Sequence, residues 1–464
     1  MLAQPDERHD NSVMTYEIEL KLRFAPDKTA ALQQALDSRA TRGGHSTLNN
    51  TYFDTEEGAL SRQTCALRIR QKGETAFEQT LKTLGSSQGG LTVRHEWNWP
   101  LDQGQLDASL LASDEVLGHW PEGISADSLM PLFNTHFERQ RWIWQLGQSE
   151  VEIVLDQGLV QAQGAEIPLC ELELELLQGD PAVIWRMAEA LCAEVPLWIS
   201  DISKAERGYR LLGLGRDWQQ PGDVFEVGVD FANLPDQLNN CFEWIKRALE
   251  TLLWEAPPPT TQLAVGFAAH LLAFFTLARL EPSYRQCLPT VTLVNPSLAL
   301  TSACLVRTEF AQQSPVVQCA VTDIAEWRDQ PMLAQTLLKL GRWLWQLQTS
   351  TSTPLPQQGK MTFDRLLAQC QSDPEHRGAG LEQPQRLVEW MLLDDGLALT
   401  SRWHHDVRTS AAELLGLQLE LTAIRHYTPT LNSEDWRQRC QQRDDRRLHL
   451  SSLLIQLSEQ RPLV

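Results

Sequence analysis

The chain has 464 residues, of which 42% are hydrophobic and 22% charged, and its formal net charge is −20 with a pI near 5.0. This length predicts two domains, because single cores stop growing at smaller sizes. The acidic balance argues against nucleic acid as the main partner, since phosphate backbones attract basic surfaces. Residues 1–220 hold 19 Lys and Arg against 33 Asp and Glu, and residues 221–464 hold 21 against 27, so most of the excess acid lies in the first half.

Nine cysteines are scattered along the chain without CxxC pairs, which predicts buried, reduced thiols and a cytoplasmic location. No apolar run reaches the length of a membrane-spanning helix, so no membrane partner is expected. The polar start MLAQPDERHDNSV differs from a secretory signal. Because Met14 stands directly before the first predicted strand, residues 1–13 are expected to be a disordered extension or to precede the true start.

The stretch YEIELKLRF, from Tyr16 to Phe24, alternates apolar and charged residues. Such alternation is typical of a strand, because extended side chains point to opposite faces. Similar stretches follow at residues 49–54, 67–70, 77–84, 92–99, 137–146, 150–156 and 171–176. Short turns between them predict an antiparallel sheet, and closure into a barrel would remove its exposed edges.

Amphipathic helices are predicted over residues 27–39, 181–194 and 200–212. Gly43-Gly44 is expected to end the first of them, and Ser203 is the expected N-cap of the third. The segment GSSQGG at 85–90 is interpreted as a hairpin connection. These helices would cover the apolar outer face of the barrel.

After the linker-like stretch GLGRDWQQPGD at 213–223, the pattern changes from period two to helical spacing. Helices are predicted over residues 238–255, 261–280, 324–348, 381–393, 411–426 and 433–460. The sequence thus predicts an α+β fold, with an N-terminal closed antiparallel β-barrel, flanking helices and a following all-α helical bundle. The expected boundaries are 14–215 for the barrel domain, 216–230 for a linker and 231–464 for the helical domain.

If the charged strand faces point inward, ions of both signs meet in one cavity. The cations would be Lys21, Arg23, Arg68, Arg70, Lys82, Arg94, Arg139 and Arg141, and the anions Glu17, Glu19, Glu96, Glu150, Glu152, Asp156, Glu171, Glu173 and Glu175. So many charges cannot be buried unpaired, which predicts a wet cavity or a charged ligand. Arginine forks fit phosphate oxygens, and carboxylates are hard ligands for Mg²⁺ or Mn²⁺. Phosphoryl transfer uses both.

The ExExK pattern of Glu17, Glu19 and Lys21 resembles the start of the CYTH superfamily, the triphosphate tunnel metalloenzymes. The resemblance covers about residues 14–215 and continues, in order, through Arg68 with Arg70, Lys82, Arg94 with Glu96, Arg139 with Arg141, residues 150–156, residues 171–175 and the SKAERGY segment at 203–209. The segments LDQG and CELELELL, at 155–158 and 170–177, look most like the two-domain bacterial inorganic triphosphatases.

Those two-domain proteins carry a helical CHAD domain after the tunnel domain, so the resemblance implies a CHAD-like second half with polyphosphate as a partner. CHAD domains typically have His and basic residues on their helices. Here His270 is followed by LLAFFTLARL, and the second half is net acidic. The CHAD-like assignment therefore depends on position and helicity.

The resemblance also implies roles for individual residues. Metal ligands would be Glu17, Glu19, Glu171, Glu173 and Glu175. Triphosphate would be held by Lys21, Arg68, Arg70, Lys82, Arg94, Arg139 and Arg141. Glu96, Glu152 and Asp156 would orient the attacking water or add metal ligands, and Lys204 would close one end of the tunnel. The implied reaction is metal-dependent hydrolysis of inorganic triphosphate to pyrophosphate and phosphate. Adenylate cyclase, thiamine triphosphatase and a non-catalytic polyphosphate-binding protein are the alternatives.

Overall fold

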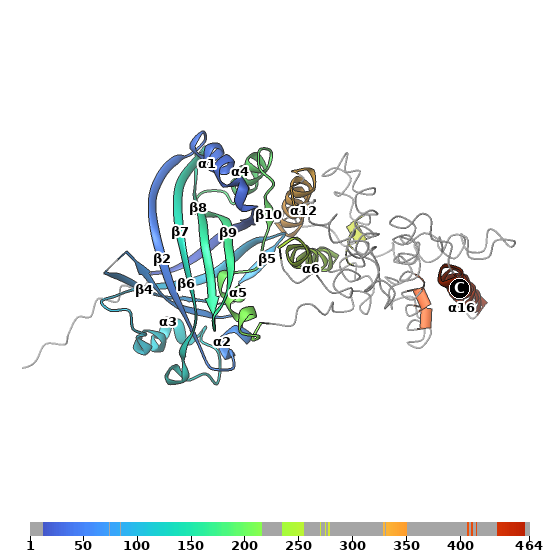
Figure 1. Cartoon of the computed structure of the whole chain (residues 1–464), viewed down its shortest axis with the longest axis horizontal. Coiled ribbons are helices and arrows are strands. Elements are labelled where there is room, and N and C mark those ends of the chain that lie inside the picture. The colour runs from blue at the N-terminus through green and yellow to red at the C-terminus, as the bar shows by residue number, and fades with distance from the viewer. Residues whose placement is uncertain are drawn as a thin grey trace, which may run out of the picture. The chain divides into compact units, whose positions relative to one another are not determined.

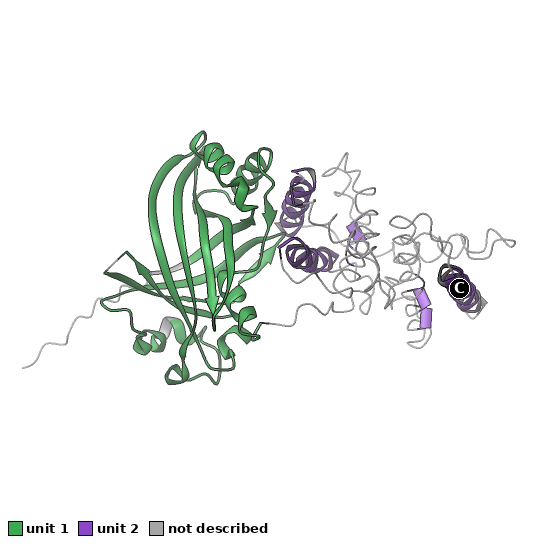
Figure 2. Ribbon diagram, viewed as in Figure 1, with its two compact units in different colours: residues 1–217 green, residues 218–464 purple. Residues whose placement is uncertain are grey.

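The chain is divided into two compact units, Met1–Asp217 and Trp218–Val464 (Figure 2). The computed structural model describes residues 13–73, 75–83, 85–215, 234–254, 270, 274, 277–278, 328–329, 331–349, 406–407, 410–411, 414 and 434–459.

The first unit consists mainly of strands, with short helices between them. In chain order its elements are β1 (Val13–Arg23), η1 (Pro26–Lys28), α1 (Thr29–Asp37), β2 (Thr41–Asp54), α2 (Ala59–Arg62), β3 (Ala66–Lys72), β4 (Ala76–Lys82), β5 (Ser86–Gln88), β6 (Leu91–Leu101), η2 (Ala108–Ala112), α3 (Asp114–Leu117), η3 (Ala126–Ser128), β7 (Met130–Leu146), β8 (Ser149–Ala162), β9 (Ala165–Gln178), α4 (Ala182–Cys192), β10 (Trp198–Ile199) and α5 (Lys204–Leu211).

The strands form one closed antiparallel barrel in the order β1-β9-β8-β7-β2-β3-β4-β6 (Figure 1). The pairing of β1 with β6, over Val13–Leu20 and Leu91–Asn98, closes it. Two short strands add to this barrel, β10 beside β1 and β5 beside β6. The predicted barrel is therefore confirmed.

Apolar residues on the outer face of the barrel are buried under helices and loops. Leu172 and Leu174 of β9 are fully buried, and α4 packs against this strand. Figure 1 shows α4 beside α1 at one end of the long strands, with α2 and α5 at the other end. The connection between β6 and β7 packs Leu111 against Leu81 and Trp97. The apolar half of each alternating pattern thus forms the core around the barrel.

Local boundaries differ from the sequence-based expectation at three places. Strand β2 begins at Thr41 and includes Gly43 and Gly44, whereas α1 has already ended at Asp37. Its first half pairs with β7 although its residues do not alternate, so pairing across the sheet overrides local propensity. The GSSQGG connection contains β5, which pairs with β6. Strand β1 begins at Val13, opposite Asn98, and the expectation of disorder for residues 1–12 lies outside the described residues.

The second unit is helical where it is described. Its long helices are α6 (Leu234–Trp254), α12 (Pro331–Thr349) and α16 (Glu434–Glu459). Phe274 packs against both α6 and α12. The centroid of its ring lies 5.8 Å from that of Phe242 on α6 and 6.4 Å from that of Trp343 on α12. Most of the helices expected at 261–280, 381–393 and 411–426 lie outside the described residues.

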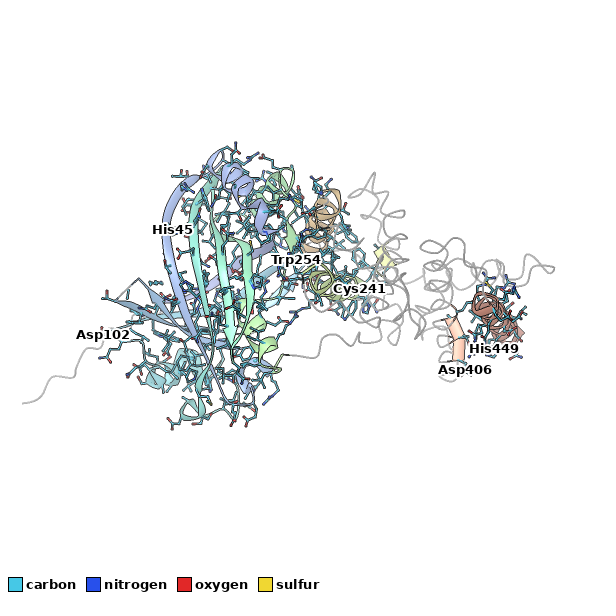
Figure 3. All side chains as sticks on the ribbon, in the orientation of Figure 1. His45, Asp102, Cys241, Trp254, Asp406 and His449 are labelled. Atoms are coloured by element: carbon cyan, nitrogen blue, oxygen red, sulfur yellow. The ribbon has the colours of Figure 1, made fainter. Side chains whose placement is uncertain are left out.

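The cysteines that the structure describes carry thiol groups. Cys65, Cys170, Cys192 and Cys241 are buried, and Cys440 is half-buried (Cys241 is labelled in Figure 3). Burial raises the pKa of Cys192 to about 11 and that of Cys241 to about 12, so both stay protonated at neutral pH. Among the described helices, none combines the length and the apolar character needed to cross a membrane.

Candidate active site

The charged faces of the strands turn into the barrel. Lys82 on β4 contacts Glu17 on β1 although β6 lies between the two strands, so both side chains are on the same face of the sheet. Arg139 on β7 reaches Glu173 on β9 across β8 in the same way. The predicted residues at the interior positions of β1 and β3, and Glu171 of β9, are less than 10% exposed, whereas Glu173 and Glu175 of β9 are half-buried.

One ionic cluster joins β1, β4 and β6. The register places Glu17 directly opposite Arg94, whose Nε donates to Glu17 Oε2 at 2.7 Å. Lys82 Nζ lies 2.8 Å from both oxygens of Glu17 and 2.9 Å from Glu96. Arg94 also pairs with Glu19. Burial alone would raise the pKa of Glu17, but the charges of Lys82 and Arg94 hold it well below its usual range.

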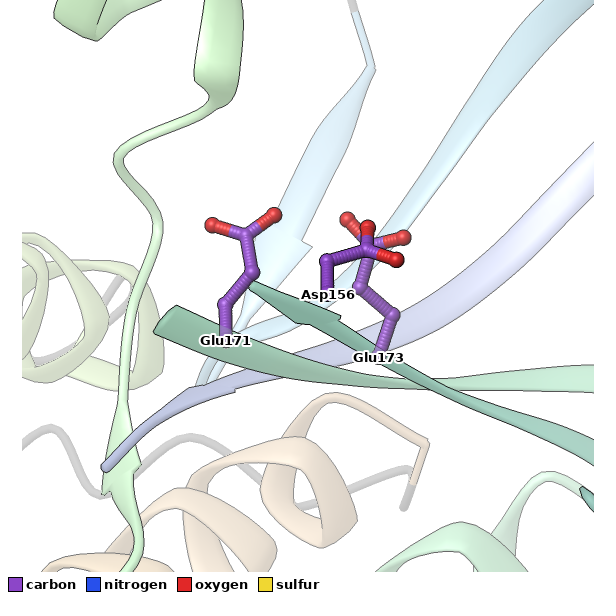
Figure 4. Close-up of side chains that lie close together, drawn as sticks. All are labelled: Asp156, Glu171 and Glu173. Carbon is purple, nitrogen blue, oxygen red and sulfur yellow. The ribbon is translucent and has the colours of Figure 1, made fainter. Parts of the chain in front are cut away.

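A second cluster surrounds Lys204, the first residue of α5. Its ammonium lies among the carboxylates of Asp156, Glu171 and Glu173, at 2.7 Å from Asp156 and 3.0 Å from Glu173 (the carboxylates are shown in Figure 4). Burial alone would lower the pKa of Lys204, but these three anions raise it to about 12. Arg139 adds a bidentate pair with Asp156, at 2.8 and 2.7 Å.

The local sequence explains why α5 delivers this lysine. Ser203 caps the helix by accepting a hydrogen bond from the backbone N–H of Glu206, as predicted. Arg207, three residues after Lys204 and therefore on the same helix face, pairs with Glu171 at 2.7 Å. Sequence reasoning did not assign Arg207 to the site. The i, i+3 spacing from Lys204 was the signal that could have found it.

A third region is rich in cations. Arg68 and Arg70 of β3 are both buried, and Arg68 approaches Glu96 only to 4.0 Å. Among the described residues, no carboxylate forms an ion pair with Arg70. Burial, together with the charges of Arg68 and Arg139, lowers the pKa of Arg70 to about 9. A buried, like-charged and unneutralised pair of guanidinium groups is a site for an anion.

In a fourth region, carboxylates from three adjacent strands lie side by side. The register places Glu175 of β9 directly between Glu19 on β1 and Glu152 on β8. Burial and the neighbouring charge of Glu17 raise the pKa of Glu175 to about 8. Carboxylates that face one another across adjacent strands repel unless a cation lies between them. Their oxygens are the ligand type that Mg²⁺ or Mn²⁺ takes, so the donor set fits a divalent ion.

The remaining predicted residues occupy different surroundings. Lys21 lies 3.3 Å from Glu173 and 3.5 Å from Glu19, inside the barrel. Arg141 differs from the other cations because its side chain is 51% exposed, and its Nε pairs with Glu152 at 3.2 Å. Glu171, expected among the metal ligands, is fully buried and holds both Lys204 and Arg207.

Comparisons with known proteins agree with this architecture. A model of the CYTH domain matches residues 15–209. The inorganic triphosphatase of Haemophilus influenzae is 33% identical over 278 residues, which span 57% of this chain and 76% of that protein.

Two solved structures are similar to part of the chain. A candidate adenylyl cyclase from Hippeastrum, described as having a dominant triphosphatase activity, is 22% identical with a TM-score of 0.33, over 42% of this chain and 95% of its own. A candidate adenylate cyclase from Bacillus halodurans is 21% identical with a TM-score of 0.28, over 41% and 96%. The identity and coverage of the Haemophilus influenzae relative, together with the matched domain, show that the chain belongs to the CYTH family.

Proposed function

We propose that the barrel hydrolyses inorganic triphosphate to pyrophosphate and phosphate with the help of a divalent cation. The main support for this proposal is that cationic side chains and carboxylates occupy different parts of the barrel interior. Arg68 and Arg70 form a buried cationic wall in which Arg70 has no carboxylate partner among the described residues, and Glu19, Glu152 and Glu175 face one another in adjacent strands. A metal-bound polyanion satisfies both regions at once.

The reaction adds a water oxygen to a terminal phosphorus and breaks the bond from that phosphorus to the bridging oxygen. The predicted cations Lys21, Arg68, Arg70, Lys82, Arg94, Arg139 and Arg141 would hold the phosphate oxygens and neutralise their charge. Glu96 and Glu152 would orient the attacking water. Asp156 is engaged by Arg139 and Lys204, so its contribution would be to hold these cations in place. Preorganised charges of this kind are often the largest contribution to phosphoryl-transfer catalysis.

Glu17, Glu19 and Glu175, with Glu173, are the residues proposed to hold Mg²⁺ or Mn²⁺. When bound, such an ion would act as a Lewis acid and offset the negative charge that develops on the phosphate oxygens. Glu17 and Glu19 are paired with Arg94 in this structure, so we expect the arginine to turn toward phosphate as these carboxylates become ligands.

Other expectations stay predictions. These are the linker at 216–230, the CHAD-like nature of residues 231–464, polyphosphate as a partner of that half, and the cytoplasmic location.

The direct test is turnover by the purified full chain with Mg²⁺ or Mn²⁺, supplied in turn with triphosphate, ATP and thiamine triphosphate. We expect the highest kcat/KM for triphosphate, measured as phosphate release. Formation of cyclic AMP from ATP at a higher kcat/KM would favour the cyclase instead. Tight binding of polyphosphate without turnover of any substrate would favour the non-catalytic alternative.

The variant Arg70→Ala tests whether Arg70 belongs to an anion-binding site. Because Arg70 carries an uncompensated charge, we expect KM for triphosphate to rise by about 10- to 100-fold, the range of a charged hydrogen bond. Arg42→Ala is the matched control, since Arg42 lies on β2 of the same barrel but its side chain is 56% exposed and pairs with Asp37 at 3.6 Å. Equal effects of the two substitutions would contradict an anion site at Arg70.

A further inference from the structure

On β2 the neighbours of Arg70 are neutral, whereas on β4 Glu78 lies directly opposite Arg70 and forms its ion pair with Lys72, at 2.8 Å. The register of β2 places Asn50 directly opposite Arg70 on one side and directly opposite Thr135 of β7 on the other. Arg70 Nε donates to Asn50 Oδ1 at 2.9 Å, and Asn50 Nδ2 donates to Thr135 Oγ1 at 2.9 Å. Asn50 and Thr135 are each 1% exposed, so this chain of hydrogen bonds lies in the interior.

The chemistry of the three groups fixes the direction of this chain. A guanidinium Nε can only donate, so the amide must present its oxygen to Arg70. The amide nitrogen then needs an acceptor, which the Thr135 hydroxyl supplies. Because Nε is held by Asn50, the plane of the guanidinium is fixed. The terminal N–H groups of Arg70 remain for another acceptor, and a neutral amide leaves the positive charge intact.

The next interior position of the same strand is also neutral. Tyr52 lies directly opposite Arg68. Strand β2 therefore places a neutral polar residue opposite each arginine of β3. Elsewhere in the barrel Arg94 and Arg139 are neutralised by carboxylates at 2.7 Å. This contrast separates arginines that are oriented from arginines that are neutralised.

We propose that Asn50, fixed by Thr135, is a positioning residue that orients Arg70 toward the triphosphate without neutralising it. This inference rests on the proposed function of the same site. The positioning role differs from a purely structural role in two requirements. The residue at position 50 must be a neutral hydrogen-bond acceptor, and its hydrogen bond to Thr135 must fix its orientation.

The decisive variant is Asn50→Asp, which keeps the shape and the acceptor oxygen but adds a charge beside Arg70. A buried ion pair would form, so we expect the melting temperature to stay equal or rise while KM for triphosphate rises by about 10-fold or more. A purely structural role would instead lower the melting temperature and leave KM unchanged in the folded fraction. An unchanged KM in Asn50→Asp overturns the proposal.

The same two strands provide a matched control on the other face. Thr51 Oγ1 donates to Asn134 Oδ1 at 2.9 Å, so a threonine and an asparagine are paired here too, but in an exposed position. Asn134→Asp adds the same charge one residue away from Thr135, and we expect KM within about twofold of the wild type because exposed charges are screened. A rise in KM equal to that of Asn50→Asp contradicts an effect specific to the interior.

The partner hydroxyl is tested by Thr135→Val and its conservative counterpart Thr135→Ser. Loss of the hydroxyl frees the Asn50 amide to turn, so Thr135→Val should raise KM and Thr135→Ser should restore it. We call the hydrogen bonds from Arg70 to Asn50 and from Asn50 to Thr135 the relay. Equal KM values in the two Thr135 variants would overturn the relay. If Asn50→Asp does not fold, these two variants test the proposal in its place.

Triphosphate binding also has a readout that is independent of turnover, the rise in melting temperature on adding triphosphate. If the wild type shows this rise without hydrolysis, and Asn50→Asp shows a smaller rise, the proposed function fails while the positioning role of Asn50 stands. If the wild type hydrolyses triphosphate and Asn50→Asp shows an unaltered rise in melting temperature, the relay alone fails.

Discussion

Glu175 is a carboxylate inside the barrel whose pKa is raised by its surroundings. Burial and the charge of Glu17 raise its pKa from 4.5 to about 8. Between these values the folded protein binds a proton that the unfolded chain has lost. Stability from this group is therefore fully present below the unfolded pKa and is lost as pH rises through 8. We expect the melting temperature of the protein, kept free of metal with a chelator, to fall between about pH 5 and about pH 8.

The variant Glu175→Gln removes this titration, so its melting temperature should change less over the same range. Glu166→Gln is the control, because Glu166 lies on the same strand in an exposed position near Gln161. The explanation would be wrong if the wild type and Glu175→Gln lost stability in parallel.

Individual site residues could be predicted where apolar and charged residues alternate along a strand, because such alternation shows which side chains lie on the same face of the sheet. Glu17, Glu19 and Lys21 are all interior and buried, as expected from their spacing. The partners of these residues were not predictable, because Glu17 meets Arg94 only through the pairing of β1 with β6. Asn50 was overlooked for a related reason: a neutral residue next to a charged wall carries no signal until the register shows what lies opposite.

At the scale of an element, the fit of α5 decides whether Lys204 reaches its carboxylates. Gly208 of this helix packs against Phe133, and a Cβ at this position would lie 2.1 Å from the phenyl ring. We expect Gly208→Ala to destabilise the fold by about 1–3 kcal/mol, the usual cost of overpacking. Urea unfolding measures this loss. Turnover by the folded fraction should also fall, since the displaced helix carries Lys204 away from Asp156.

Gly118→Ala is the corresponding control, because no atom lies within 4 Å of a Cβ there and the backbone has an ordinary helical φ of −67°. Similar unfolding free energies for the two variants would show that α5 tolerates displacement.

Most elements of the barrel were predictable, since strands and the Ser203 cap have local signals. The errors occurred where tertiary pairing acts against local sequence. The first half of β2, TRGGHST, neither alternates nor favours a strand, and it extends because β7 pairs with it. Strand β5 in GSSQGG is likewise held by β6.

At the scale of the whole molecule, the chain divides after Asp217, and all the charged groups proposed for hydrolysis belong to the first unit. The closed barrel has its own core and its own helices, so residues 1–217 meet the usual requirements of a domain that folds alone. We expect this fragment to hydrolyse triphosphate with kcat/KM within about threefold of the full chain, because all the charged groups proposed for hydrolysis lie in this unit, and a domain with its own core can in principle fold alone. Circular dichroism would verify the strand content before the assay. A fragment that is folded but loses most of its turnover would show that residues 218–464 contribute to catalysis, and the single-domain account of the site would have to be abandoned.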